Sequence, residues 1–311
     1  ADKLRLLRLR RELGRGGDER VDRETTISEY LADRGFSRAF VERFAEPFYG
    51  GITLDRSLET SSGVFEYTFR MLSTGETVVP AEGMSSIPDQ LRRRAEDAGA
   101  SVRTGVSVTG LDVARSRDRR GGVTVETSEG DRSPDAAVVA TDPKTAGELT
   151  GVETPTGSKA CVTVHCSLPE YQSLDTGSRI VLNAENDRPN TVAPMSAAAP
   201  EYAPDGAQLL SATFLGERGE DDDELGEIVR EAMASWFPEN HFGGFEVVGV
   251  DRIEFAQFPQ PPGFRAELPA VDAPQGPVVL AGDYTRWSSI QGALESGRRA
   301  AEEVVESGDD L

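Results

Sequence analysis

Cysteine and histidine are scarce in this sequence. The only cysteines, Cys161 and Cys166, lie in the apolar stretch ACVTVHC, where the alternation of a strand would place them on opposite faces. A disulfide framework is therefore not expected, and buried free thiols in a reducing cytoplasm fit better. The only histidines, His165 and His241, are far apart in the sequence, so no zinc or other metal site is predicted.

Long apolar runs are also lacking. No run approaches the ~20 residues of a membrane-spanning helix, so stable membrane insertion is not expected. The N-terminal stretch ADKLRLLRLRREL is basic and amphipathic, but it has neither the apolar core nor the cleavage site of a secretory signal. We interpret it as a helix entered partway through a longer protein, and we predict a cytoplasmic location.

Positive charge is in short supply, with 33 Lys plus Arg against 54 Asp plus Glu and a formal net charge of −21. This charge disfavours binding to nucleic acids and to anionic membranes. Lysine occurs only at Lys3, Lys144 and Lys159. Few lysines and many carboxylates suggest a salt-rich cytoplasm, and our hypothesis is a halophilic, haloarchaeal source. The alternative is a protein that is merely acidic.

The halophilic hypothesis predicts that the melting temperature rises between dilute buffer and molar potassium chloride. Counterions screen the mutual repulsion of the carboxylates, which strains the fold in dilute buffer. Thermal unfolding at a series of potassium chloride concentrations measures the effect. A melting temperature that does not respond to salt would leave only the merely acidic protein.

The first 75 or so residues have the apolar spacing of helices. We predict one helix over 4–13, a breaker GRGG at 14–17, a second helix between a cap at Thr26 or Ser28 and a stop at Gly35, and a third over 36–47 that ends around Pro47. Aromatic side chains are frequent here and form either ordinary core, which we favour for most of them, or the wall of an apolar substrate cavity: Phe40, Phe44, Phe48, Tyr49, Phe65, Tyr67 and Phe69.

From residue 77 onward, strands and helices alternate, which predicts an α/β or mixed α+β fold class. Residues 77–113 indicate a strand, a loop, a helix and a strand. An alternating strand over 122–130 follows, and then a continuously apolar strand over 135–142 that would be buried on both faces. Beyond Pro143 we predict a short helix, several strands, and an acidic helix from Asp221 to Phe237 whose carboxylates suit the helix N-terminus.

The most informative segment is VVLAGDYTRWSSIQGALESGRRAAEEVVE, residues 278–306. It predicts a buried strand, a turn at Gly282 and Asp283, a short loop, and a helix from about Ser289 to Glu306. A crevice forms at the carboxyl end of such a strand, where Asp283 projects and the helix offers unpaired N–H groups. Small residues along the helix would let a cofactor lie close to it, but tight packing of helix on sheet explains them as well: Gly292, Ala293, Ser296, Gly297 and Ala300.

This segment resembles the C-terminal FAD signature of flavin amine oxidases, phytoene desaturases and protoporphyrinogen oxidases, through Gly282-Asp283, Gly292-Ala293, Ser296-Gly297 and Ala300-Ala301. Residues 80–113 resemble a helix and strand of this superfamily in which the main chain of a Val pairs with adenine, and Val108 matches that Val. Residues 135–143 resemble the strand that precedes the substrate domain. The resemblance implies a partial FAD/NAD(P)-binding Rossmann-like domain (79–142 and 271–311), interleaved with a substrate domain that has a helical part (1–78) and a sheet part (143–270).

The resemblance also implies how FAD would be bound. Asp283 would contact the ribityl or diphosphate part, the loop 286–290 would lie against the flavin ring, and N–H groups near Ile290 would stabilise negative charge on the reduced flavin. The residues predicted to bind the cofactor are Val108, Gly282, Asp283, Trp287, Ser288, Ser289, Ile290, Gly292 and Ala293. Members of the superfamily open with a GxGxxG βαβ unit, which this sequence lacks, so we expect that unit to be truncated or separately encoded and FAD occupancy to depend on it.

The sequence identifies no firm catalytic residue. Amine oxidation in many relatives uses a lysine near flavin N5, and Lys159 precedes the corresponding strand with a register that is one residue off. We therefore interpret Lys159 as a surface lysine and only a weak catalytic candidate. The aromatic helical layer favours an apolar, isoprenoid-like substrate that gives hydride to flavin. A flavin amine oxidase, and a non-catalytic remnant that binds an apolar ligand or a partner chain without FAD, stay as alternatives. The partner expected for this chain is a second copy of it in a homo-oligomer or a complementing N-terminal chain.

Overall fold

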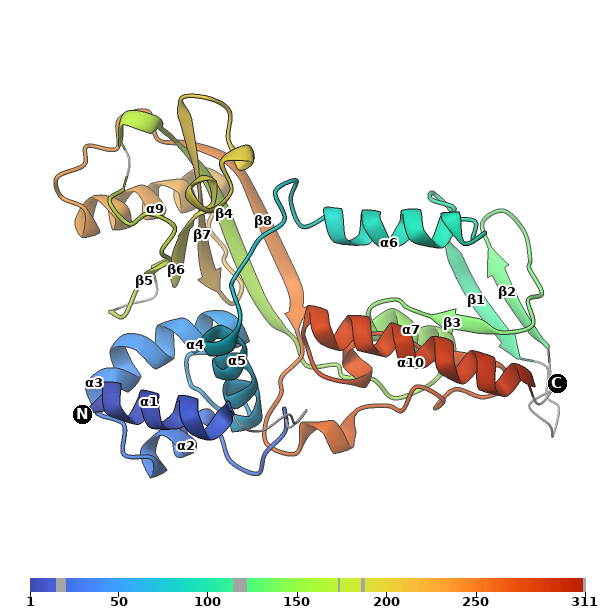
Figure 1. Ribbon diagram of the computed structural model, residues 1–311. Helices are drawn as coiled ribbons and strands as arrows, with labels where there is room; N and C mark the ends of the chain where they lie inside the picture. The colour runs from blue at the N-terminus through green and yellow to red at the C-terminus, as the bar shows by residue number, and fades with distance from the viewer. Residues whose placement is uncertain (15–20, 114–121, 173, 186–187, 310–311) are drawn as a thin grey trace. The chain divides into compact units, whose positions relative to one another are not determined.

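The computed structural model describes residues 1–14, 21–113, 122–172, 174–185 and 188–309 (Figure 1). The chain divides into two compact units, and each unit combines two separated segments. Unit 1 consists of Ala1–Gly99 and Ser158–Gln257, and unit 2 consists of Ala100–Gly157 and Phe258–Leu311. Helices and several sheets occur together, which confirms the mixed α/β class. No helix in the described ranges is long and apolar enough to cross a membrane.

Unit 1 begins with helices: α1 (Asp2–Leu13), α2 (Ile27–Asp33), α3 (Arg38–Phe40), the π-helical turn η1 (Val41–Ala45), α4 (Glu46–Thr53), α5 (Ser62–Thr74) and α6 (Ser86–Asp97). Helix α2 starts at the predicted place because Thr26 and Glu29 form a capping box. The Glu29 N–H donates to Thr26 Oγ1 at 3.1 Å, and the Thr26 N–H donates to Glu29 Oε2 at 3.0 Å. Of the predicted breaker at 14–17, only Gly14 lies within the described residues.

The prediction that the third helix ends around Pro47 is wrong. The helix continues through Pro47 as α4 and ends at Thr53, where Leu54 adopts a left-handed conformation with φ of 54°. The π-helical turn that precedes α4 is the reason, since the Glu46 N–H bonds the Val41 carbonyl five residues back. This wider turn accommodates a proline, which has no N–H and would otherwise clash with a carbonyl of the preceding turn.

Aromatic side chains fill the interior of the helical layer, as the preferred core interpretation predicts. Tyr49 and Phe65 are each 1% exposed, and their ring centroids are 4.6 Å apart. Phe40, Phe48 and Phe69 pack around them, whereas Phe44 stays 38% exposed. These rings therefore stabilise the layer mainly by burying apolar area and by stacking on one another.

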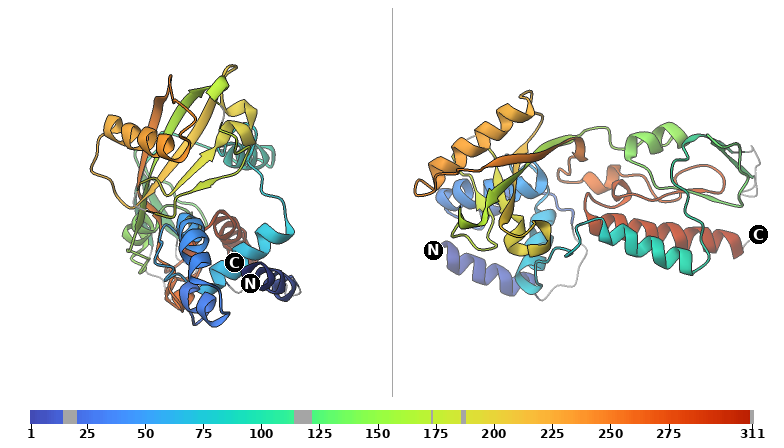
Figure 2. Two further views of the ribbon diagram at one scale, coloured as in Figure 1. Left: turned by 90° about the vertical axis from the view of Figure 1, so that its left-hand side faces the viewer. Right: turned by 90° about the horizontal axis from the view of Figure 1, so that it is seen from above.

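The second half of unit 1 is a five-stranded antiparallel sheet in the order β5 (Val181–Leu182), β6 (Thr191–Pro194), β7 (Ala207–Leu215), β4 (Lys159–Pro169) and β8 (Glu246–Gln257). The short helix α8 (Met195–Ala198) follows β6, and α9 (Asp222–Trp236) covers one face of the sheet (Figures 1 and 2). Met233 of α9 belongs to the same buried core cluster as Val164 and Cys166 of β4. Cys166 is fully buried and Cys161 lies on the opposite face as a free thiol, as predicted.

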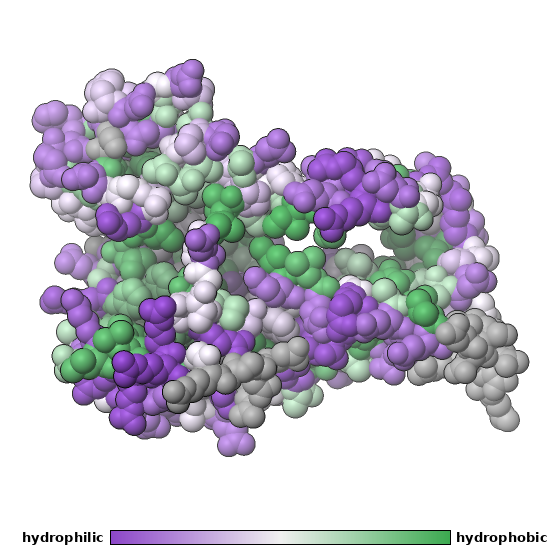
Figure 3. Space-filling model, viewed as in Figure 1, coloured by the Kyte–Doolittle hydropathy of each residue, from purple (hydrophilic) through white to green (hydrophobic). Residues whose placement is uncertain are grey.

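Unit 2 contains two small sheets. Strands β1 (Val108–Val113) and β2 (Val123–Thr127) form an antiparallel pair, and β3 (Ala137–Val139) and β9 (Val278–Leu280) form a parallel pair. Helix α7 (Pro143–Thr150) follows β3, and α10 (Ile290–Asp309) follows β9 and packs on it through Ala300. In the view of Figure 3, the visible surface of α10 is mainly hydrophilic.

Two strand predictions are wrong in part. Residues 77–80 form no strand, and Val78 is 78% exposed, because a short apolar segment becomes a strand only where another strand pairs with it. Strand β3 is continuously apolar as expected, but it is not buried on both faces: Val138 is 48% exposed. Within the described residues, β9 is its only partner strand.

Candidate functional site

Two aspartates lie at equivalent positions after the two parallel strands of unit 2. Strands β3 and β9 pair in register, with Val139 opposite Leu280. Asp142 lies three residues after Val139, and Asp283 lies three residues after Leu280. Because the carboxyl ends of parallel strands lie at the same edge of a sheet, both aspartates lie at the edge where α/β proteins bind ligands.

The two aspartates differ in their electrostatics. Burial raises the pKa of Asp283, and hydrogen bonds offset part of this effect, among them one from Ser288 Oγ to Oδ2 at 3.1 Å. Asp142 caps helix α7, where its Oδ1 accepts from the Thr145 N–H at 3.0 Å, and these contacts with Thr145 lower the pKa of Asp142. Asp142 is therefore readily ionised, whereas Asp283 is held in surroundings that disfavour its charge.

The loop between Asp283 and α10 is held at several points. The Ser288 N–H donates to Gln260 Oε1 at 3.0 Å, and Trp287 is only 8% exposed. Arg286 is buried as well, with its guanidinium carbon 5.8 Å from the Trp287 ring centroid. The indole is thus packed within the protein, and its predicted contact with the flavin ring stays a prediction.

Small residues occur on two different faces of helix α10, one buried and one exposed. Gly292, Ser296 and Ala300 are buried at a spacing of four, so tight packing of the helix explains them. At Gly292, the Trp287 carbonyl occupies the space that a Cβ would need. Ala293 and Gly297 lie on the exposed face together with Ile290, which is 50% exposed. Only this second face offers small residues that a ligand or a partner could approach.

The first turn of α10 keeps part of its capacity to donate hydrogen bonds. Ser289 caps the helix, since its Oγ accepts from the Gly292 N–H at 2.8 Å and its carbonyl accepts from the Ala293 N–H at 3.0 Å. Among the described residues, the N–H groups of Ile290 and Gln291 have no such acceptor. They are the unpaired donors that helix N-termini offer to electron-rich ligands.

Most residues predicted to bind the cofactor come together in this one turn, but Val108 does not. Gly282, Asp283, Gly292, Ala293 and the loop 287–290 all surround the start of α10. Val108 begins β1 in the other small sheet of unit 2, where it pairs with Thr127 and is 45% exposed. Its predicted contact with adenine stays a prediction.

Two further residues at this edge of the sheet, Asp142 and Tyr284, were not selected from the sequence. Tyr284 is 1% exposed, and its ring lies over Gly282, where a Cβ would collide with it. Its hydroxyl has no hydrogen-bond partner among the described residues. A signal existed, because the segments VVATD and VVLAGD both end in an aspartate just beyond an apolar strand.

Lys159 is less exposed than a surface lysine, contrary to our interpretation. Its side chain is 16% exposed, and Nζ lies 2.9 Å from Asp55 Oδ2. Asp55 follows α4, so this ion pair ties the start of β4 to the helical layer. Gln257 supports the same junction, since its Nε2 donates to the Ile52 carbonyl at 2.7 Å.

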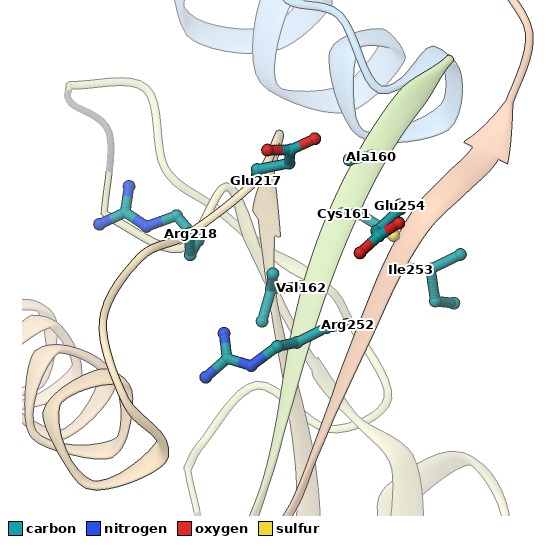
Figure 4. A pocket seen from close by; sticks show the side chains of 8 residues that line it. All are labelled: Ala160, Cys161, Val162, Glu217, Arg218, Arg252, Ile253 and Glu254. Atoms are coloured by element: carbon teal, nitrogen blue, oxygen red, sulfur yellow. The ribbon is translucent and has the colours of Figure 1, made fainter.

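Unit 1 also contains a cavity of about 140 Å³ at one end of β4 and β8 (Figure 4), lined by Ala160, Cys161, Val162, Glu217, Arg218, Arg252, Ile253 and Glu254. Its two arginines already bind carboxylates near the start of α9, Arg218 that of Glu220 and Arg252 that of Asp222. The cavity is smaller than the roughly 300–1,000 Å³ of typical small-molecule sites. No group of three or more metal-ligating side chains occurs in the described part of the chain.

Solved structures of several oxidoreductases share the fold of this chain. An oxidoreductase from Methanosarcina mazei matches with a TM-score of 0.70 and 16% identity, over 97% of this chain and 72% of its own. A protein from Exiguobacterium sp. 255-15 assigned as a protoporphyrinogen oxidase matches with a TM-score of 0.69 and 16% identity, over 94% and 70%. Putrescine oxidase with bound putrescine matches with a TM-score of 0.66 and 14% identity, over 98% and 75%. At such identities the likeness concerns the fold.

The sequence itself matches the model of the flavin containing amine oxidoreductases over residues 4–305. The chain therefore belongs to this family, which confirms the resemblance based on the C-terminal motif. No curated protein sequence matches the chain. The carboxyl edge of β3 and β9 in unit 2 fits the cofactor of the family, because it combines a carboxylate, a buried hydroxyl without a partner among the described residues and unpaired helical N–H groups.

Proposed function

We propose that this chain is an FAD-dependent oxidoreductase in which flavin accepts hydride from an apolar, isoprenoid-like substrate. The observation that carries the proposal is the turn from β9 into α10, where Asp283, the Ser288 hydroxyl and the helix N-terminus converge. Membership in the family of flavin containing amine oxidoreductases supports the same cofactor. When bound, FAD would supply the redox chemistry, and the protein would supply position and electrostatics.

Each part of the turn has a distinct task in this proposal. The carboxylate of Asp283 would accept hydrogen bonds from the cofactor, with Ser288 holding its orientation at 3.1 Å. The N–H groups of Ile290 and Gln291 would stabilise negative charge, as preorganised dipoles do. Trp287 and Arg286, both buried, would keep the loop in place and exclude water from it.

The apolar substrate class is supported by exposed apolar side chains that follow one another in unit 1. They occupy the end of α5 and the segment after it, and each is between 37% and 78% exposed: Met71, Leu72, Val78, Val79 and Met84. Such surface is costly to leave in water and is typical of sites that contact apolar ligands or partners.

A complementing N-terminal chain is part of the proposal. The parallel pair β3–β9 has a half-exposed Val138 in its centre, and α10 presents Ile290 and Leu294, which are 50% and 49% exposed. Parallel sheets in α/β proteins are normally covered on both faces. A βαβ unit from another chain would cover this surface and bring the GxGxxG loop that holds the diphosphate of FAD.

The expected result for the cofactor is that protein purified in molar potassium chloride shows, or acquires with added FAD, the visible absorption bands of bound oxidised flavin. Anaerobic mixing with candidate substrates then tests the reaction, and bleaching by a polyene rather than by an amine is expected. A colourless protein that ignores FAD, with and without a supplied βαβ unit, would contradict the proposed function.

A flavin amine oxidase is the second candidate, because Lys159 is shielded from solvent and ion-paired rather than exposed. Its ammonium is held 2.9 Å from Asp55, and it could act on an amine only after leaving this pair. In the experiment above, bleaching of the flavin by an amine such as putrescine, and not by an apolar compound, would favour this candidate.

A further inference from the structure

Helix α1 has an outer surface that is basic and partly apolar. The helix carries five basic side chains against two acidic ones, in a chain whose formal net charge is −21. Its inner side packs into the core of the helical layer through Leu6, Leu9 and Leu13. On the outer side, Leu4 and Leu7 are 72% and 55% exposed, and at a spacing of three they are neighbours on the helix surface. Such a pair of exposed leucines is costly to leave in water and indicates a surface that contacts a partner.

Three cations lie next to one of these leucines. Lys3 is four residues before Leu7, and Arg10 and Arg11 are three and four residues after it, so all three are its neighbours on the helix surface. All three are exposed, and they have no ion-pair partner among the described residues, whereas the other two arginines of α1 are paired with acids of the same helix. The outer surface of α1 therefore places an apolar side chain amid unpaired positive charge.

A cavity with apolar lining lies elsewhere in unit 1, where α9 packs on the first residues of β8. It is open to solvent, has a volume of about 440 Å³, and is called the α9–β8 cavity below. Phe245 and Val247 line it together with Gly226, whose lack of a Cβ lets α9 approach the Val247 side chain. The volume suits side chains that project from a helix lying across the cavity, and not a whole helix, which is about 10–12 Å wide.

The rest of the lining of the α9–β8 cavity is mainly acidic. Asp223, Glu227 and Glu246 line it, and Arg230, the one basic side chain among the lining residues, is paired with Glu227. Asp223 and Glu246 are exposed and have no ion-pair partner in the part of the chain that the structure describes. The cavity thus combines apolar contacts with unpaired negative charge, which is the electrostatic complement of the outer surface of α1.

We propose that α1 of one copy of this chain docks on the α9–β8 cavity of a second copy. Leu7 enters the cavity beside Phe245 and Val247. The cations of α1 then lie near Asp223 and Glu246. The partner is a second copy because both complementary surfaces occur on one chain, and because α1 and α9 lie at opposite ends of unit 1 and do not meet within one copy (Figures 1 and 2).

The contact joins two unlike surfaces, which limits the assemblies that it can form. Two copies that exchange their helices form a closed dimer, and copies that add one after another form a row. Side chains of one helix in one cavity make a small interface, so we expect a weak association that depends on protein concentration. The inference does not depend on the proposed function, since neither surface involves flavin.

The net charge of the chain sets the conditions for measuring this association. Two copies that each carry −21 repel each other in dilute buffer. In molar potassium chloride the Debye length falls to about 3 Å, so the long-range repulsion is screened. Charges in direct contact and the burial of leucine side chains still act under these conditions. Sedimentation equilibrium of the full chain in molar potassium chloride is therefore the appropriate measurement.

Two substitutions test the two surfaces separately. Leu7→Glu places a carboxylate against the acidic cavity, and Glu246→Arg places a cation against the cations of α1. We expect each variant to associate at least about tenfold more weakly than the wild type, because apolar contact or charge complementarity is lost. Both positions are exposed, so melting temperatures should stay within about 2 °C of the wild type. Val305→Glu, at a 63% exposed position of α10 in unit 2, is the matched control and should associate as the wild type does.

A mixture of the two variants is the decisive measurement. Leu7→Glu retains its cavity and Glu246→Arg retains its helix, so the mixture should associate about as strongly as the wild type. Two weakened variants that do not recover on mixing would show that these two surfaces do not meet. Association that neither substitution weakens would place the contact elsewhere, and a wild type that stays monomeric up to its solubility limit would exclude it. Each of these three results overturns the inference, and none of them bears on the proposed function.

Discussion

Replacing Gly292 with alanine is expected to destabilise the protein by about 1–3 kcal/mol and to impair binding of FAD, because the added Cβ overpacks a tight contact. In the structure, that Cβ would collide with the backbone carbonyl of Trp287, which cannot rotate away as a side chain can. The loop 286–290 would have to move, and with it Ser288, which orients Asp283. Denaturant unfolding and FAD titration measure the two effects.

Gly297→Ala is the matched control on the same helix. No atom lies within 4 Å of the position where its Cβ would be. Alanine in an exposed helical position is favoured over glycine, so this variant should gain roughly 0.5–1 kcal/mol of stability. Equal stabilities of the two variants would contradict the assigned contact between Gly292 and the Trp287 carbonyl.

Replacing Asp283 with asparagine is expected to weaken FAD binding by roughly 10- to 150-fold, since a hydrogen bond to a charged group contributes about 1.5–3 kcal/mol. Asparagine preserves the shape and one acceptor oxygen, so the Ser288 hydroxyl retains its partner. The melting temperature of the cofactor-free variant near neutral pH should be higher than that of the wild type, because a carboxylate held in disfavouring surroundings is removed. An affinity for FAD equal to that of the wild type would exclude Asp283 from the site.

The pH dependence of stability has a definite sign for this variant. The pKa of Asp283 is raised in the folded state, mainly by burial, so the folded protein holds this proton more tightly than the unfolded chain does. The protonated carboxyl therefore favours folding at low pH, and this contribution is lost as the pH rises through the raised pKa. The gain in stability from Asp283→Asn should accordingly be large at neutral pH and should shrink as the pH falls below that value. A gain independent of pH would show that the charge is not the cause.

Elements with local signals were predictable from the sequence. Helices α2 and α9 begin where a capping box stands, Thr26 with Glu29 and Asp221 with Glu224. The turn from β9 into α10 was predictable for the same reason, because an apolar strand, a Gly-Asp turn and a serine cap lie within a short stretch of chain. In these cases the residues that determine the structure are near neighbours, and their interactions need no information from elsewhere in the fold.

Features that depend on distant partners were not predictable in this way. Residues 77–80 have the composition of a strand but form none, and Val138 of the apolar strand β3 is half exposed. Both outcomes depend on which other strands and helices pack next to the segment, and its own sequence does not contain that information. The passage of the third helix through Pro47 required a π-helical turn that no residue pattern indicated.

The family, the mixed α/β class and the turn that carries Asp283 follow from the sequence alone, because the motif from Gly282 to Ala301 is contiguous and its chemistry is local. The tertiary structure alone decided which groups meet around that turn. Pairing of β3 with β9 brings Asp142 to the same edge as Asp283, although 141 positions separate them in the chain. It likewise decided that Tyr284 is buried without a partner and that the Trp287 carbonyl requires glycine at 292. Such juxtapositions arise from strand pairing and close packing, which operate in space and are not encoded in any one stretch of residues.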